Sequence, residues 1–530
     1  MKQGVLLIID GWGFAPPAPD NAIALAATPT LDEIAARCPG TLASASGEAV
    51  GLLPGHVGNS EIGHMVIGAG RPLAYDSLLL QQEIDSGALL SNARFTGACS
   101  RLANRGSVLH LVGLASDGQI HSSVGHFGPL LEAAAMLGVR HARVHAITDG
   151  RDVADGTACG YLQQLERDSA NAGIGTLATI VGRNYAMDKT GDHAVTASAM
   201  HAIADGVGRH REHYTDAFPA VRGDGWVEPT VLPDPDRRAV PIDDGDVVLF
   251  VNFRSDRTQQ LADMLADQLF KGPRPRSVEL LSVAHYDTVA QIPALVTRTD
   301  ASGGLADGLE EHELASVRVA EREKYEHVTY YMNGRDNRKR PLEVHIRIDG
   351  SAHPDYRSQP QMNVARLANV VTRVARSREF PLVIANLSNI DVVAHAGDHQ
   401  ATVAATESVD GAIARICDAA GAAGRWVMLV GDHGNGERMT RPGPDGRSQP
   451  YGGHTANPVP LMFLPAPGSS APRGPARATL ADVAPSIMAL LGCSPTRQMT
   501  GRPLFGAVNG SLTRAPSSRT PDEPPAGVLA

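Results

Sequence analysis

The sequence predicts an α/β protein of two domains, and three observations lead to this expectation. Between residues 92 and 181, apolar segments of strand length alternate with longer segments of helical pattern, the order that βαβ units around a parallel sheet produce. The chain has 530 residues, whereas a single core rarely grows beyond roughly 250 to 300 residues. Its composition, 43% hydrophobic and 20% charged, suits a soluble globular protein.

The first expected strand, Val5 to Ile9, is a run of leucines and β-branched residues that ends at Asp10. Such a continuous apolar run is typical of a buried parallel strand. Because open α/β sheets bind ligands at the carboxyl ends of their strands, Asp10 is a candidate site residue. Taken alone, it would more often be a turn aspartate. Residues 28 to 37, with a proline and acids near the start, predict a helix.

Ser60 lies on a glycine-flanked bend, Gly58 to Gly63, just before an apolar helical run. One explanation is a helix N-cap, since Asn and Ser are favoured there. The other is a nucleophile, which needs an adjacent base or a metal ion because a serine hydroxyl is weakly nucleophilic near neutral pH. The stretch is not a G-x-S-x-G elbow. Acids and imidazoles follow other expected strands, so a metal-activated serine is our working interpretation.

The expected elements then follow in regular order: helices near 92–104, 126–137 and 157–172, and strands at 107–114, 142–147, 175–181 and 247–251. The loops after these strands carry polar and charged residues, namely His121, Arg151, Asp152, Arg183, Lys189, Arg254 and Arg257. All of these loops should open on one edge of the sheet. Arg254 and Arg257 share a helix face if a helix starts there, and by default they are a solvated pair. Arginines at three successive strand ends favour an anion-binding pocket instead.

A second set of candidate residues lies further along the chain. Asp391 and His395 are four residues apart, which on a helix places both side chains on one face as a metal-binding pair. An apolar strand at 426–430 runs directly into Asp432 and His433. Each of these residues alone would more often be structural than catalytic.

His454, on a glycine turn, completes this set. With Asp10, Ser60 and the four residues above it makes seven oxygen and nitrogen donors, the number that two bridged divalent ions need with positions left for a substrate.

Charge and composition exclude several other classes of protein. The formal net charge of −10 argues against a general nucleic-acid binder, which shows a basic face. No apolar run approaches the about 20 residues that span a bilayer, and residues 4 to 10 are too short and too acidic at their end for a signal-peptide core. The five cysteines include no C-x-x-C pair, so neither a zinc knuckle nor a disulfide framework is expected. We expect a cytoplasmic protein.

In its combination of motifs the sequence resembles the cofactor-independent phosphoglycerate mutases of the alkaline phosphatase superfamily, along residues 4 to about 507. The matching stretches are Leu7 to Gly13, Gly58 to His64, Asp149 to Asp152, Asn252 to Arg257, Glu323 to Thr329, Asp432 to Asn435 and His454 to Pro460. Their order and combination are highly specific.

This resemblance implies a domain organisation. An alkaline-phosphatase-like doubly wound sheet would be formed by residues 1–74 and 296–508, interrupted by an inserted α/β substrate domain at 75–295. Residues 509–530, rich in Pro, Ser and Thr, are expected to be a disordered tail. We expect a monomer.

The resemblance also implies two manganese ions, with zinc or cobalt as alternatives, and no need for 2,3-bisphosphoglycerate. One ion would be held by Asp391, His395 and His454, and the other by Asp10, Ser60, Asp432 and His433.

The implied reaction is the interconversion of 3-phosphoglycerate and 2-phosphoglycerate, in glycolysis and gluconeogenesis. Ser60 would take the phosphoryl group as phosphoserine and return it to the other hydroxyl of the same glycerate. Asp152 would handle the proton of the hydroxyl, and Lys324 would reach the phosphate. The substrate would be held by His121, Arg151, Asp152, Arg183, Lys189, Arg254, Arg257 and Lys324.

Three other functions stay open at this point. Lys189 stands where the family usually has an arginine, and residues 338–362 lack the family's usual sequence, so a relative that acts on an analogue such as a phosphonate is one alternative. The second is a metal-dependent phosphatase, against which the arginines of residues 75–295 argue. The third is a non-catalytic sensor of phosphate or metal, against which the full set of donors argues.

Overall fold

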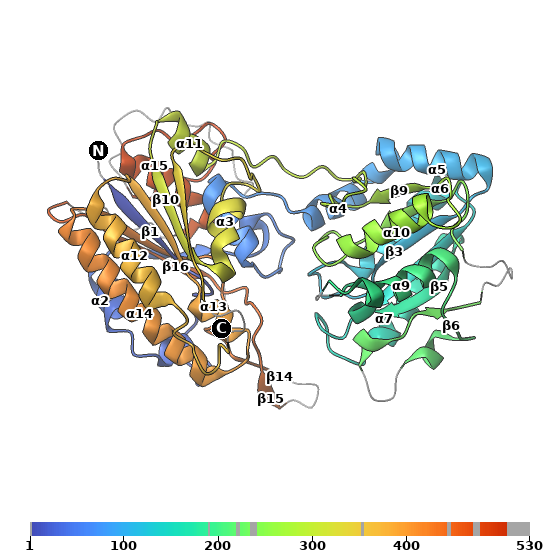
Figure 1. Cartoon of the computed structure of the whole chain (residues 1–530), viewed down its shortest axis with the longest axis horizontal. Coiled ribbons are helices and arrows are strands. Elements are labelled where there is room, and N and C mark those ends of the chain that lie inside the picture. Colours follow the sequence, from blue (N-terminus) through green and yellow to red (C-terminus); the bar gives the residue numbers. More distant parts are fainter. Residues whose placement is uncertain are drawn as a thin grey trace, which may run out of the picture.

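The computed structural model describes residues 3–188, 191–218, 223–233, 241–350, 355–442, 447–469 and 477–505. These residues form two lobes, each built on its own sheet (Figure 1). We call them the eight-stranded lobe and the seven-stranded lobe. Lys189 and the expected tail at 509–530 lie outside the described residues.

The sheet of the eight-stranded lobe has the order β11-β10-β12-β1-β13-β16-β2-β17. Its strands are β1 (Gly4–Ile9), β2 (Gly40–Ser44), β10 (Ser316–Glu321), β11 (Glu343–Ile348), β12 (Leu382–Leu387), β13 (Trp426–Gly431), β16 (Val459–Leu464) and β17 (Ala478–Thr479). The run from β11 to β13 is parallel, and β16 pairs antiparallel with both of its neighbours. Strand β1 is fully buried at the centre, as its apolar sequence predicted.

Helices cover both faces of this sheet, and the alternation of side chains along β1 shows how (Figure 1). Val5, Leu7 and Ile9 pack with residues of α2 (Pro29–Arg37), α12 (Val364–Ser377) and α14 (His399–Ala422). Leu6 and Ile8 point to the other face and share a core with α3 (Ser60–Ala69), α11 (Leu305–Glu311) and α15 (Val483–Leu491). Successive side chains of a strand point to opposite faces, so one apolar run supplies two cores.

The seven-stranded sheet has the order β6-β7-β5-β4-β3-β8-β9. Its strands are β3 (Leu109–Leu114), β4 (Ala142–Thr148), β5 (Gly175–Gly182), β6 (Arg209–His210), β7 (Thr230–Val231), β8 (Val247–Phe250) and β9 (Glu279–Ser282). One face carries α5 (Ala93–Arg105), α6 (Phe127–Met136) and α7 (Ala158–Ala172), and the other carries α9 (His193–Asp205) and α10 (Gln259–Lys271). The expected α/β class with two sheets is confirmed.

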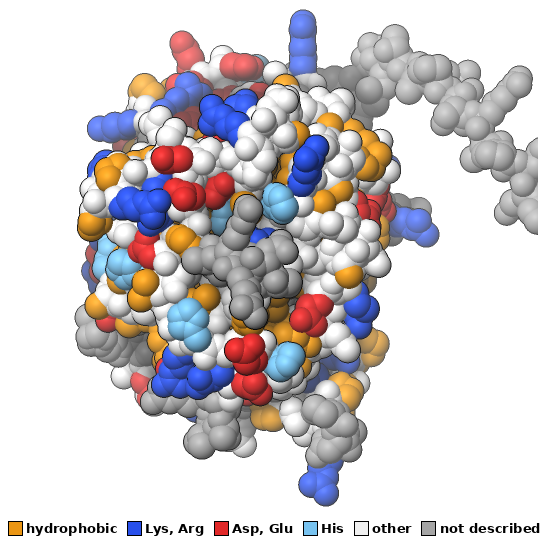
Figure 2. Space-filling model, turned by 90° about the vertical axis from the view of Figure 1, so that its right-hand side faces the viewer, with side chains coloured by type: hydrophobic (Ala, Val, Ile, Leu, Met, Phe, Trp, Pro, Cys, Tyr) orange, Lys and Arg blue, Asp and Glu red, His pale blue; other side chains and the backbone are white. Residues whose placement is uncertain are grey.

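Shorter elements complete the fold: α1 (Ala22–Leu25), α4 (Asp76–Asp85), α8 (Arg183–Ala186), α13 (Asn389–Ala394), β14 (Thr440–Pro442) and β15 (Ser448–Pro450). Among the described residues, none of the helices has the length and apolarity that crossing a membrane requires. At the end of the seven-stranded lobe that Figure 2 faces, basic and acidic side chains are interspersed rather than gathered by sign.

The condition under which Arg254 and Arg257 would share a helix face is not met, because α10 begins only at Gln259. Arg254 and Arg257 therefore lie in the preceding loop and do not share a helix face. The backbone N–H of Gln259 donates to the carbonyl of Ser255 at 2.9 Å. The loop is fixed by Asn252, whose Nδ2 donates to Thr258 Oγ1 at 2.8 Å.

The chain passes between the lobes twice, and the two connecting segments are bonded to each other (Figure 1). Thr299 Oγ1 donates to the carbonyl of Ala74 at 3.0 Å. Arg71 donates to the carbonyls of Asp300 and Ser302 at 2.7 and 2.9 Å. Strands β3 to β9 lie between β2 and β10 in the sequence, so the seven-stranded lobe is an insertion. The boundaries proposed at residues 75 and 295 stay a prediction.

Helix α3 begins at Ser60, and two of its glycines lie directly against other backbone segments. A Cβ added at Gly63 would be 2.6 Å from the carbonyl oxygen of Asp432. A Cβ at Gly68 would overlap the carbonyl oxygen of Met332. Only glycine lets α3 lie this close, and the close packing sets where Ser60 stands relative to Asp432.

We expect Gly68→Ala to lower the free energy of unfolding by about 1 to 3 kcal/mol, because the added methyl group forces a backbone shift. Gly160→Ala in α7 is the matched control: no atom lies within 4 Å of its added Cβ, so it should raise the free energy of unfolding by up to about 1 kcal/mol. Chemical denaturation of both variants measures this. Equal stabilities would mean that α3 is not held by close packing.

Candidate active site

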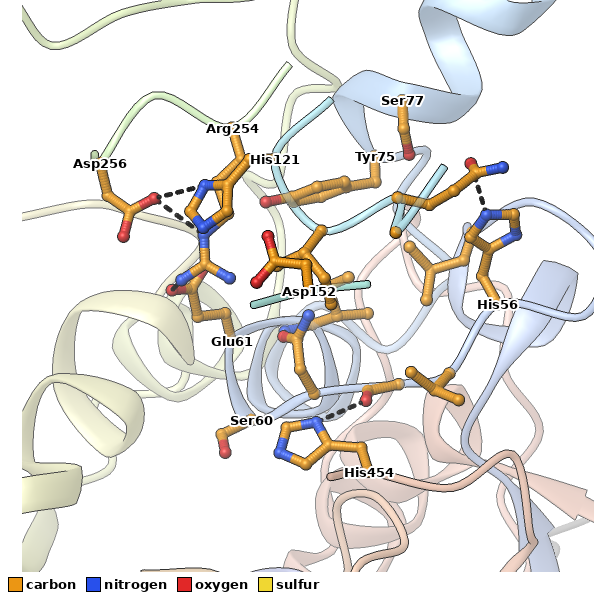
Figure 3. A pocket seen from close by; sticks show the side chains of 18 of the residues that line it. His56, Ser60, Glu61, Tyr75, Ser77, His121, Asp152, Arg254, Asp256 and His454 are labelled. Carbon is orange, nitrogen blue, oxygen red and sulfur yellow. Dashed lines mark hydrogen bonds and ion pairs between the residues drawn. The ribbon is translucent and has the colours of Figure 1, made fainter. Parts of the chain in front are cut away.

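A cavity of about 720 Å³ lies between the two lobes. Figure 3 shows Ser60 and His454 on one side of it, His121 and Arg254 on another, and Asp152 between them. The eight-stranded lobe contributes Ser60, Glu61, Lys324, Asp391, His395 and His454 to its lining, and the seven-stranded lobe contributes His121, Arg151, Asp152, Arg183, Arg254 and Arg257. The loops after β3, β4, β5 and β8 therefore open on one edge of their sheet, as predicted.

The cap of α3 is Asn59, whose side chain accepts a hydrogen bond from the backbone N–H of Ile62 at 3.0 Å. The N-cap explanation for Ser60 is therefore wrong. Its hydroxyl is left for other contacts: it donates to Asp10 Oδ1 at 3.2 Å and lies 2.9 Å from His433 Nε2. Ser60 is buried, yet it lines the cavity.

Three buried carboxylates lie at neighbouring strand ends beside Ser60. Asp10 follows β1, Asp432 follows β13, and Asp391 lies in α13 just after β12. Lys324 Nζ lies 2.7 Å from Asp10 Oδ1, 2.7 Å from Asp391 Oδ2 and 2.5 Å from Ser60 Oγ. Burial lowers the pKa of Lys324, but Asp10 and Asp391 more than offset this effect, so its pKa lies above the ordinary value and the amine stays charged.

His395 and His454 face each other beside Asp391. Their Nε2 atoms are 3.2 Å apart, and lie 3.3 and 3.4 Å from Asp391 Oδ1. Each Nδ1 contacts a backbone carbonyl, that of Gly452 at 2.7 Å and that of Gly58 at 2.9 Å. Since a carbonyl can only accept, each Nδ1 carries the proton, and in the neutral rings both Nε2 lone pairs converge on the carboxylate. This arrangement suits a divalent cation.

The other expected ligands also lie together. His433 Nε2 is 3.4 Å from Asp10 Oδ1 and 3.6 Å from Asp432 Oδ2. Burial lowers the pKa of His433, but Asp432 and the hydrogen bond to Asp10 raise it to about 10. Asp432 Oδ2 makes no hydrogen bond to the residues that the structure describes, although His64 Nδ1 lies 3.2 Å from it. His433 also groups with Asp10 and Asp391, so the two donor sets adjoin.

His64 and Asn386 belong to this centre, although no role for either was predicted from the sequence. His64 Nδ1 contacts the carbonyl of Ser60 at 2.8 Å, and its Nε2 accepts from Asn386 Nδ2 at 3.0 Å. Asn386 Nδ2 also donates to Asp10 Oδ2 at 2.7 Å. Both ring nitrogens of His64 are thus engaged, and although it lies 3.2 Å from Asp432, it orients the site rather than offering a free donor. The available signal for His64 in the sequence was its position in the stretch Gly58 to His64, which also contains Ser60.

Glu437 is a second residue that the sequence did not single out. Its buried carboxylate accepts from the backbone N–H of Asn435 at 2.8 Å, from Asn457 Nδ2 at 3.0 Å and from Thr455 Oγ1. Asn435 Nδ2 donates in turn to Asp391 Oδ1 at 2.8 Å. Glu437 therefore ties the loop after β13 to the loop that carries His454.

On the opposite wall, Asp149 organises the loop after β4. Its carboxylate accepts from the backbone N–H groups of Arg151 and Asp152 at 3.1 Å each, from Ser116 Oγ at 2.7 Å and from Arg183. Arg183 Nη1 also lies 2.9 Å from Asp152 Oδ2. Burial raises the pKa of Asp152, and Arg183 partly offsets this. A carboxyl with a raised pKa suits proton transfer.

Asp256, which the sequence also left without a role, organises the loop after β8. Its carboxylate lies 2.9 Å from Arg254 Nε, 3.4 Å from Arg257 Nε and 3.5 Å from His121 Nδ1 (Figure 3). Burial and the charge of Arg254 lower the pKa of His121 to about 3, so its ring is neutral near pH 7. Arg254 also reaches across the cavity to Glu61 Oε1, 3.1 Å from its Nη2. One carboxylate thus positions three of the expected substrate-binding residues.

Comparison with known proteins agrees with this geometry. A family model described as BPG-independent PGAM N-terminus matches residues 80–288. The 2,3-bisphosphoglycerate-independent phosphoglycerate mutase of Streptomyces coelicolor is 55% identical over 504 residues, 95% of this chain and 98% of that protein. A protein of the same name from Desulforudis audaxviator is 35% identical over 510 residues, 94% of this chain and 98% of that protein.

A crystal structure of Leishmania mexicana phosphoglycerate mutase, obtained at low cobalt concentration, gives a TM-score of 0.76 at 28% identity, and the match covers 95% of this chain and 97% of that one. The expected resemblance is therefore confirmed along almost the whole chain. With a relative 55% identical over 95% of its length, the chain belongs to the family of 2,3-bisphosphoglycerate-independent phosphoglycerate mutase enzymes.

Proposed function

We propose that the chain interconverts 3-phosphoglycerate and 2-phosphoglycerate through a phosphoserine at Ser60. The observation that carries the proposal is the position of Ser60: its hydroxyl is not used for capping, touches buried acid, imidazole and ammonium groups, and lines a cavity whose far wall holds arginines. The names of the relatives support the same reaction.

We propose two divalent ions at this centre, with manganese first and zinc or cobalt as alternatives. Asp391, His395 and His454 would hold one ion, and Asp10, Ser60, Asp432 and His433 would hold the other. The converging Nε2 lone pairs of His395 and His454, and the close grouping of Asp10, Asp432 and His433, support this assignment. When bound, such ions lower the pKa of the serine hydroxyl and neutralise charge on the phosphoryl group.

In the first half-reaction, the alkoxide of Ser60 attacks phosphorus of 3-phosphoglycerate. A bond from Oγ to phosphorus forms while the bond from phosphorus to the C3 oxygen breaks. The charged amine of Lys324, 2.5 Å from Oγ, stabilises the alkoxide before attack and phosphoryl oxygens after it. Asp152 supplies a proton to the departing C3 oxygen, which its raised pKa favours.

The second half-reaction reverses these roles at the neighbouring hydroxyl. The C2 hydroxyl of the retained glycerate gives its proton to Asp152, and its oxygen attacks the phosphoserine, whose bond to Ser60 breaks. Retention depends on contacts to the glycerate carboxylate. For these we propose the cations Arg151, Arg183, Lys189, Arg254 and Arg257, with the neutral ring of His121 as a hydrogen-bonding group. A phosphatase has no need to retain the alcohol, so this arginine-rich wall favours a mutase.

We further propose that the protein acts as a cytoplasmic monomer on this small phosphorylated acid, without a nucleic-acid or membrane partner. The five cysteines are all free, which suits a reducing compartment.

Purified protein supplied with manganese and 3-phosphoglycerate should form 2-phosphoglycerate, which added enolase converts to phosphoenolpyruvate for detection. Chelation should abolish the reaction because the donor set is arranged for metal ions, and 2,3-bisphosphoglycerate should not stimulate it. Release of inorganic phosphate as the main product would contradict the mutase and support a phosphatase. Turnover of a phosphonate analogue alone would support the alternative substrate.

Ser60→Ala should lower turnover by at least about a thousandfold, since removal of a nucleophile leaves little of the covalent route. Ser77→Ala is the control: Ser77 is also a buried serine of the cavity lining, and Figure 3 shows it on the side opposite Ser60. It should retain turnover. Mass spectrometry of acid-quenched enzyme should find the phosphoryl group on Ser60, and a phosphorylated residue elsewhere would refute the assignment.

A further inference from the structure

Among the residues that the structure describes, two side-chain hydrogen bonds join the lobes across the cavity. Glu61 Oε1 lies 3.1 Å from Arg254 Nη2, and His56 Nε2 lies 2.6 Å from Gln119 Oε1. Glu61 and His56 belong to the eight-stranded lobe, and Figure 3 shows them at opposite sides of the cavity. Their partners Arg254 and Gln119 belong to the seven-stranded lobe. Of these two bridges, the first joins opposite charges and the second joins polar groups.

Arg254 has one carboxylate partner from each lobe. Asp256, two residues away on its own loop, contacts Nε at 2.9 Å, so this contact persists however the lobes stand. Glu61 directly follows Ser60 on the other lobe and contacts Nη2, so this contact depends on the relative position of the two lobes. The side chains of Arg254 and Glu61 are 25% and 19% exposed, which leaves both within reach of a ligand in the cavity.

A guanidinium binds a carboxylate or phosphate best through two parallel N–H donors. While Glu61 holds Nη2, an anion that enters the cavity cannot take that edge of Arg254 without displacing Glu61. The negative charge of Glu61 also repels an anion that approaches Ser60. Conversely, without a bound anion Glu61 gives Nη2 a charged partner, whereas Asp256 contacts the guanidinium only at Nε.

We propose that Glu61 is an internal competitor of the substrate: its carboxylate occupies Arg254 in the unliganded enzyme, and an anionic group of the substrate displaces it. The inference rests on the proposed function, because it assumes that Arg254 binds phosphoglycerate. The measured binding free energy then reflects the difference between the Arg254–substrate contact that forms and the Arg254–Glu61 contact that breaks. Displacement also breaks one bridge between the lobes, which couples substrate capture to lobe movement.

Isothermal titration of metal-loaded Ser60→Ala protein with 3-phosphoglycerate tests the proposal, since this background binds without turnover. Adding Glu61→Gln should lower Kd by about three- to tenfold, because the competing charge is gone. Glu61→Asp keeps the charge but shortens the side chain, so it should give a smaller decrease and serves if the glutamine variant folds poorly. Asp256→Asn should raise Kd, because Arg254 loses the partner on its own loop.

Gln119→Ala is the matched control, since it removes the other bridge without freeing a cation, and its Kd should stay within about twofold of the parent value. An unchanged or higher Kd for Glu61→Gln would overturn the competitor role and leave the proposed function standing. Equal tightening by Glu61→Gln and Gln119→Ala would also overturn it, because loosened lobes would then explain the gain. If the metal-loaded Ser60→Ala parent does not bind 3-phosphoglycerate, the proposed function itself is refuted.

Discussion

The structure depends on three carboxylates that are buried at the ends of adjoining strands. Asp10, Asp391 and Asp432 lie side by side because β12, β1 and β13 are neighbours in a parallel sheet. Burying an unpaired charge costs several kcal/mol. In the described structure Lys324 contacts Asp10 and Asp391 at 2.7 Å each, and His433 Nε2 lies 3.4 to 3.7 Å from all three carboxylates. Divalent cations would neutralise the remainder, and Ser60 lies where that positive charge would act.

The two lobes divide the proposed chemistry between them. The eight-stranded lobe carries the nucleophile and the metal donors, while the seven-stranded lobe carries the groups proposed to hold glycerate. Asp149, Asp256 and Glu437 give each wall its geometry, since each carboxylate fixes several neighbouring side chains or loops. The lobes join through two bonded segments and meet through side chains across the cavity. The proposed binding of a substrate at Arg254 would therefore also change a contact between the lobes.

The sequence revealed residues whose position follows from local pattern. Asp10 and Asp432 follow apolar runs that are typical of buried strands, and the edge that they share follows from parallel topology. The roles of His64, Asn386 and Asp256 were not predicted, because they depend on partners that only folding brings close. Ser60 was ambiguous for a related reason, since two adjacent residues could each cap α3, and the backbone selected Asn59. A helix start at Arg254 was only one possibility, and the loop instead holds a local hydrogen bond between Asn252 and Thr258.

The central claim is that the phosphoryl group returns to the glycerate from which it came, and a crossover experiment tests it directly. One sample of 3-phosphoglycerate carries ¹³C in glycerate, a second carries ¹⁸O in the non-bridging phosphoryl oxygens, and the two are mixed with enzyme. Mass spectrometry of the 2-phosphoglycerate formed should find only the two original pairings of label, since glycerate stays in the cavity in the proposed mechanism. Doubly labelled and unlabelled product in proportions set by random mixing would show that glycerate leaves between the half-reactions, and would contradict this account.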